Sequence, residues 1–154
     1  MTTFETSVVI ARPLEDVFAF TTDISNNTKW QKILVDAGLT RGETMDVGAT
    51  YRYTVKFMGK HIETEAVVTA FEENRAFSAK TLRGPVAGEF HLAFEPVYAG
   101  TALTTRCKAE LGYFKYTKPI ALRLAKEQYR KDLDVLKHIL EAPPDDCETL
   151  ACRQ

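Results

Sequence analysis

Apolar and polar residues alternate through most of the stretch from Ala49 to Leu111, and a helical pattern follows from Lys118 to Glu141. Alternation indicates strands with one buried face, whereas apolar residues three and four positions apart indicate a helix that packs along one side. This order predicts an α+β fold, in which a curved antiparallel sheet of six to seven strands wraps around a long C-terminal helix.

The segment before this sheet predicts a strand and two short helices. Alternation runs from Phe4 to Ala11, and Pro13 then opens a helix to about Phe20, because its fixed φ suits the first helical position. Cap and turn formers follow and indicate a second short helix that ends near Trp30. A weaker pattern over 32–41 predicts one more strand.

A hairpin register follows from the alternation around Gly59. The strands are Tyr51–Phe57 and His61–Phe71, and we take Gly59 and Lys60 as a two-residue turn. Apolar residues then share one face, and an opposite-charge pair lies on the other. The predicted pairs are Phe57 with Ile62, Val55 with Thr64, Tyr53 with Ala66, Tyr51 with Val68, and Lys56 with Glu63.

Three further strands follow the same rule. Phe77, Ala79 and Thr81 face inward on one strand, Gly88 to Phe94 alternate on the next, and Leu103 to Leu111 alternate on the last. Placing Phe94 opposite Leu103 brings Glu89 opposite Lys108 on the outer face. The final helix carries its own apolar stripe, formed by Leu122, Ala125, Tyr129, Leu133, Leu136 and Leu140.

The predicted inner face of the sheet carries no charged residue and no histidine, and it mixes large aromatic side chains with small ones. Two interpretations remain open here. Either the helix fills the space beside the small residues, or a cavity remains in which a few hydroxyl groups orient a ligand. The candidate ligand-binding residues are Trp30, Tyr51, Tyr53, Val55, Phe57, Thr64, Phe90, Leu92, Thr105 and Tyr129.

Composition narrows the possible partners. The chain has 154 residues, with 20 Lys and Arg against 21 Asp and Glu, so no net field favours nucleic acid. No apolar run approaches a membrane span, and the start does not resemble a secretory signal, so we expect a cytoplasmic protein.

We expect one domain over 1–142 and a mobile tail over 143–154, with Cys147 and Cys152 as free thiols. Nothing specifies the oligomeric state beyond a monomer or weak homodimer.

No catalytic or metal-binding set is visible in the sequence. His61 and His91 fall on the outer face, His138 lies off the helical stripe, and no base shares the inner face with Cys107. We therefore predict no metal and no cofactor. A bulge in the hairpin that turned His61, Glu63 or Glu65 inward would instead favour an enzyme.

The opening VVIARPLEDVFAFTTDISNNTKW resembles START-like (SRPBCC, helix-grip) proteins of the polyketide cyclase/dehydrase and lipid-transport type, with Val17, Phe18, Asp23 and Trp30 carrying the match. VGATYRYTVKFMG, GEFHLAFEPVYAGTALT and the closing helix extend the resemblance from Phe4 to Glu141. The resemblance implies a helix-grip sheet around the last helix and a cavity that binds hydrophobic molecules.

Three functions follow as expectations. The first is binding of a small hydrophobic or aromatic ligand between sheet and helix, for transport or for sensing. The second is an enzyme of the cyclase or dehydrase type that uses the same cavity, which needs a titratable group there. The third is a protein-interaction module with a filled core. The fold alone does not choose among them.

Overall fold

The computed structural model describes residues 2–42 and 44–142. Seven strands form one antiparallel sheet in the order β1-β7-β6-β5-β4-β3-β2. The predicted tail, with Cys147 and Cys152, lies outside the described residues. The strands are β1 Thr2–Ile10, β2 Leu34–Arg41, β3 Thr50–Phe57, β4 Lys60–Glu72, β5 Ala76–Arg83, β6 Gly88–Val97 and β7 Gly100–Ala109. The helices are α1 Leu14–Thr22, α2 Asn27–Trp30 and α3 Lys118–Glu141, with single turns η1 Ile24–Asn26 and η2 Leu111–Phe114.

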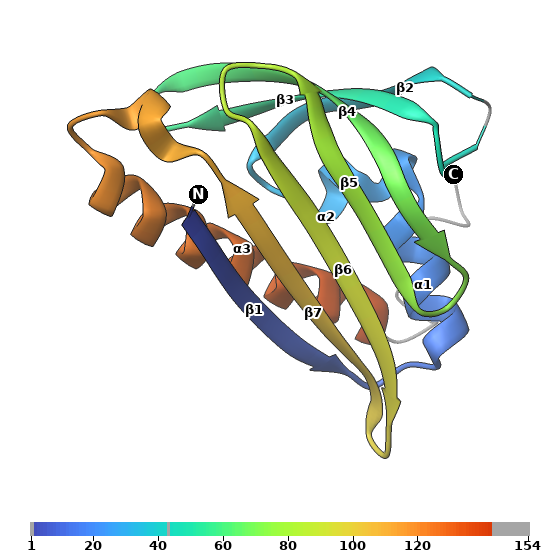
Figure 1. Ribbon diagram of the computed structural model, residues 1–154. Coiled ribbons are helices and arrows are strands. Elements are labelled where there is room, and N and C mark those ends of the chain that lie inside the picture. Colours follow the sequence, from blue (N-terminus) through green and yellow to red (C-terminus); the bar gives the residue numbers. More distant parts are fainter. Residues whose placement is uncertain (1, 43, 143–154) are drawn as a thin grey trace, which may run out of the picture.

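The sheet curves around α3, which crosses one of its faces and packs along β1 (Figure 1). α1 and α2 lie on the same side of the sheet as α3, where α1 contacts β6 and β7, and α2 contacts β2 and α3 (Figure 1). The predicted α+β helix-grip arrangement, with short helices after the first strand, is confirmed.

Proline residues set the ends of both longer helices. Pro13 has φ −58° and ψ 148° and directly precedes α1, and Pro119 lies in the first turn of α3, where a missing N–H leaves no bond unmade. Ala142 ends α3 in an extended conformation (φ −61°, ψ 140°), because the residue before a proline avoids the helical region. The bounds predicted for α3 are confirmed.

The register of the β3–β4 hairpin differs from the prediction by two residues. Phe57 pairs with Lys60, and Lys56 pairs with His61 instead of Glu63. The turn is Met58-Gly59, with φ of 51° and 77°, and two positive φ values in succession favour glycine at the second position. A shift of two residues keeps every side chain on its face, so the inner-face assignment is unchanged. The other observed pairs are Val55 with Ile62, Tyr53 with Thr64, and Tyr51 with Ala66.

The β6–β7 register agrees with the prediction. Phe94 pairs with Leu103, and Glu89 pairs with Lys108. Leu111 was predicted at the end of the last strand, but β7 ends at Ala109 and Leu111 begins η2. Its side chain is still buried, at 4% exposure, because η2 turns it back onto the sheet.

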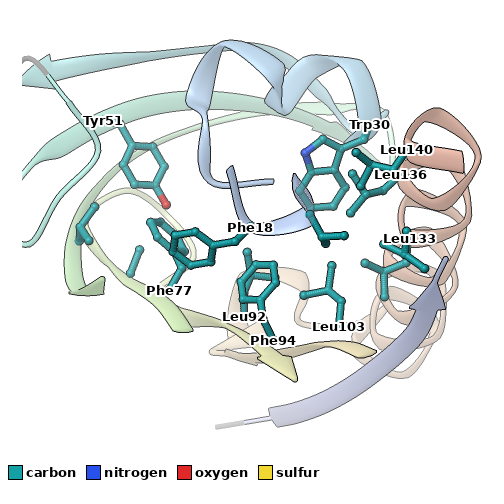
Figure 2. Close-up of a cluster of buried hydrophobic side chains, with 14 of the residues drawn as sticks. Phe18, Trp30, Tyr51, Phe77, Leu92, Phe94, Leu103, Leu133, Leu136 and Leu140 are labelled. Atoms are coloured by element: carbon teal, nitrogen blue, oxygen red, sulfur yellow. The ribbon is translucent and has the colours of Figure 1, made fainter. Parts of the chain in front are cut away.

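The core is concentrated at the C-terminal half of α3. Leu133, Leu136 and Leu140 are 0–5% exposed and lie in one cluster with sheet residues such as Leu92 and Leu103. Figure 2 shows these leucines to the right of the labelled aromatic side chains of the sheet, with Trp30 beside Leu136 and Leu140. This half of the helix therefore anchors α3 to the sheet.

Replacing Leu136 by alanine should reduce the free energy of unfolding by about 2–5 kcal/mol, because the side chain is fully buried and leaves a cavity. Leu124→Ala is the matched control, since Leu124 lies on the same helix at 44% exposure and should change stability by about 0.5 kcal/mol or less. Urea unfolding checks both values. Equal effects would contradict the assigned orientation of α3.

Candidate functional site

A cavity of about 180 Å³ lies between the sheet and the N-terminal half of α3. From α3 it is bordered by Ala125 and Tyr129, and the small side chain of Ala125 leaves more space than a leucine would at that position. Apolar cavities of roughly 150 Å³ accommodate benzene. The space therefore suits a molecule built on one substituted ring.

Nine of the ten candidate residues from the sequence border this cavity. Their side chains come from α2, from the three strands β3, β4 and β6, and from α3. Thr105 differs, because it borders a second, smaller cavity. The nine residues are Trp30, Tyr51, Tyr53, Val55, Phe57, Thr64, Phe90, Leu92 and Tyr129.

The hydroxyl and thiol groups of the cavity remain neutral near pH 7. Burial raises the pKa of Tyr53 to about 12 and that of Cys107 to about 11. Burial also raises the pKa of Tyr51 and Tyr129 above the usual value. Cys107 Sγ lies 3.9 Å from Tyr129 Oη. These groups can orient a ligand by hydrogen bonds, but they are poor proton donors to it.

The groups that would have favoured catalysis point away from the cavity. His61 and His138 are exposed. His91 Nδ1 lies 2.8 Å from Ser78 Oγ on the outer face, and Glu65 Oε1 lies 3.5 Å from Arg83 Nε. The bulge that would turn these positions inward is absent from the β3–β4 hairpin, whose register is continuous.

Asp132 is a buried carboxylate that the sequence reasoning missed. It is 3% exposed, and its Oδ1 accepts hydrogen bonds from the backbone N–H of Lys32 at 3.1 Å and from Gln128 Nε2 at 2.8 Å. Burial raises its pKa to about 6, although these two bonds and the charge of Lys32 oppose the shift. A signal was present, because Asp132 follows Tyr129 by three positions and precedes Leu136 by four, within the apolar stripe.

The second cavity, which we call the Asp132 niche, has a volume of about 10 Å³ and adjoins the end of the first. Two residues of its lining, Trp30 and Thr105, each carry a buried polar atom, Nε1 and Oγ1, that lacks a hydrogen-bond partner among the described residues. Buried polar atoms are usually paired, so these two indicate room for a missing partner. The niche is lined by Trp30, Gln31, Phe90, Thr105, Tyr129, Asp132 and Leu133.

Metal coordination finds no support in residues 2–42 and 44–142, where no group of three or more His, Cys, Asp or Glu side chains could hold an ion. Within the same residues, no helix has the length and hydropathy needed to cross a membrane.

The chain belongs to the polyketide cyclase / dehydrase and lipid transport family, whose sequence pattern matches residues 1–141. No curated protein matches it significantly. The match confirms the class suggested by the N-terminal motif, and it covers the whole sheet and α3.

Solved structures agree with this fold. A protein of Thermus thermophilus has a TM-score of 0.77 at 16% identity, covering 89% of this chain and 95% of the other. A START superfamily protein of Mycobacterium smegmatis has a TM-score of 0.73 at 16% identity, covering 90% and 97%. A protein of Deinococcus radiodurans has a TM-score of 0.68 at 20% identity, covering 89% and 95%. At these identities the likeness concerns the fold.

Asp132→Asn should stabilise the protein at neutral pH. The pKa of Asp132 in the folded protein, about 6, exceeds its value in the unfolded chain, so the folded state favours the protonated carboxyl group. The resulting contribution to folding stability is fully present below pH ~4 and is lost as the pH rises through 6. The amide oxygen that this substitution introduces can accept the same two hydrogen bonds without charge. The variant should therefore gain up to about 3 kcal/mol over the native chain at pH 7.5 and little at pH 4.

Unfolding in urea at pH 4, 6 and 7.5 measures this difference. Asp134→Asn is the control, because Asp134 lies two positions away on α3 with a 60% exposed side chain that pairs with Arg130. A difference between Asp132→Asn and the native chain that does not change with pH would contradict the burial of this carboxylate.

Proposed function

We propose that this protein reversibly binds a small hydrophobic or aromatic molecule in the cavity between its sheet and α3, for transport or for sensing. The observation that carries the proposal is the cavity itself, which is apolar over most of its lining and includes a few residues with hydroxyl groups. Such a lining holds a ligand by apolar contact and orients it by few hydrogen bonds.

The proposed contacts divide by chemistry. Val55, Phe57, Phe90 and Leu92 provide apolar surface, whereas Tyr51, Tyr53 and Thr64 provide hydrogen bonds. Trp30 and Tyr129 form walls where α2 and α3 approach the sheet. Thr105 acts through the adjoining niche. The cyclase, dehydrase and lipid transport activities in the family description fit a site of this kind.

The two alternatives differ in what they require. An interaction module with a filled core does not need the 180 Å³ of space beside Ala125. An enzyme needs a titratable group at the cavity, and Asp132, with its pKa near 6, is the observation that favours this second candidate. Turnover of a bound molecule, lost in Asp132→Asn with binding retained, would identify the enzyme.

Native mass spectrometry of the freshly purified protein, followed by organic extraction, tests the proposal without choosing a ligand. We expect a bound species whose extracted component is small and apolar. An apo mass, together with no binding of the aromatic probes p-xylene and p-cresol, would contradict a ligand-binding function.

Ala125→Leu should weaken binding in the cavity while leaving the fold intact. The added branch projects into the cavity and fills empty space, so stability should change by about 1 kcal/mol or less, or increase. Binding of the apolar probe p-xylene should weaken by about tenfold or more. Titration followed by NMR checks the affinity.

Ala121→Leu is the matched control, because Ala121 lies one turn earlier on α3 at 0% exposure and does not border the cavity. Overpacking there should cost about 1–3 kcal/mol of stability. If both variants lose the same stability and p-xylene affinity is unchanged in Ala125→Leu, the site is elsewhere.

A further inference from the structure

We propose that the Asp132 niche is a subsite for one hydroxyl group, so that the ligand is an uncharged apolar molecule that carries a hydroxyl, such as a phenol. This inference rests on the proposed function, because the apolar part of the same molecule would occupy the main cavity. It names the chemical class of the ligand and the residues that select it.

The size of the niche fits one oxygen atom. A volume of about 10 Å³ is close to the minimum that holds a single water molecule. The niche also shares Trp30, Gln31, Phe90 and Tyr129 with the main cavity. A ring beside Phe90 and Tyr129 can therefore reach the niche with a substituent one atom long.

The polar atoms around the niche match both roles of a hydroxyl. The indole N–H of Trp30 donates, the carboxylate of Asp132 accepts, and the hydroxyl of Thr105 does either. A ligand hydroxyl can donate to Asp132 or Thr105 and accept from Trp30. Hydrogen bonding of this kind would satisfy the two buried atoms that lack partners among the described residues.

The sheet itself does not satisfy Thr105. Its cross-strand neighbour on β1 is Thr6, whose Oγ1 is also buried and has no partner in the described part of the chain. The hydroxyl of Thr105 thus remains available to a molecule in the niche.

Charge excludes a carboxylate from this position. At pH 7.5 Asp132 is largely ionised, because its pKa of about 6 lies below that pH. The groups that face it are Gln128 on α3, Lys32 after α2, and the uncharged Thr105 on β7. The charge of Lys32 lowers the pKa of Asp132 less than burial raises it. A second carboxylate in the niche would therefore be repelled, whereas a neutral hydroxyl would not.

Three probes that share one methyl-substituted ring test this inference at pH 7.5 by NMR titration of the full chain. They are p-cresol, p-xylene and p-toluate, which place a hydroxyl, a methyl and a carboxylate at the same position of one ring. A purely apolar cavity favours p-xylene, since its methyl group is less hydrated than a hydroxyl. We expect the reverse order, with p-cresol bound about tenfold or more tightly than p-xylene, and p-toluate weakest.

Thr105→Val removes one hydroxyl without changing the shape of the side chain. We expect the preference for p-cresol over p-xylene to fall by about fivefold or more, and stability to be retained because the lost hydroxyl has no partner among the described residues. Thr104→Val is the matched control, because Thr104 is the preceding residue on β7 and borders neither cavity. It should leave the preference unchanged.

Asp132→Asn removes the charge of this side chain while nearly keeping its shape, so it tests the effect of the charge alone. The variant should bind p-toluate about tenfold more tightly than the native chain does, because repulsion between two carboxylates is removed. A residue that merely holds Lys32 and Gln128 in place would leave the order of the three probes unchanged on this substitution.

The results of these titrations separate failure of the hydroxyl subsite from failure of ligand binding in the main cavity. Binding of p-xylene as tightly as p-cresol, with no effect of Thr105→Val, would overturn the subsite and leave the proposed function in place. Preferred binding of p-toluate would also overturn it. If none of the three probes binds at millimolar concentration, the proposed function fails and the subsite fails with it.

Discussion

The packing of α3 on the concave face of the sheet is the constraint on which the rest of the structure depends. Large leucines occupy the inward positions of its C-terminal half, and they close the core against sheet residues such as Leu103. The inward positions of its N-terminal half include Ala125, and there the same sheet curvature leaves a cavity. One helix therefore provides both the anchor and the open site, without a separate domain for binding.

Asp132 lies at the boundary between these two halves. A carboxylate at this buried position is unfavourable for folding at neutral pH, because two hydrogen bonds do not fully offset its desolvation. A small hydrophobic residue at this position would avoid the desolvation penalty of the carboxylate. Residues that lower stability in this way are commonly found at functional sites, which agrees with the unpaired atoms of Trp30 and Thr105 nearby, as seen among the described residues.

Much of this structure could be predicted from the sequence, because alternation and helical spacing directly report which side of an element is buried. The bounds of α3, the β6–β7 register and eight of the nine cavity residues follow from it. The hairpin register was wrong because periodicity does not locate a turn, whereas the positive φ at Met58 and Gly59 does. Asp132 was missed because carboxylates usually lie on the exposed face of an amphipathic helix. The size of the cavity depends on three-dimensional packing, which no single pattern contains.

The most direct test of this account is a crystal structure of the protein soaked with p-cresol. The account predicts a ring in the cavity beside Ala125 and Tyr129, with the phenol oxygen within hydrogen-bond distance of Asp132 or Thr105. A cavity filled by rearranged side chains, with no ring bound, would contradict it.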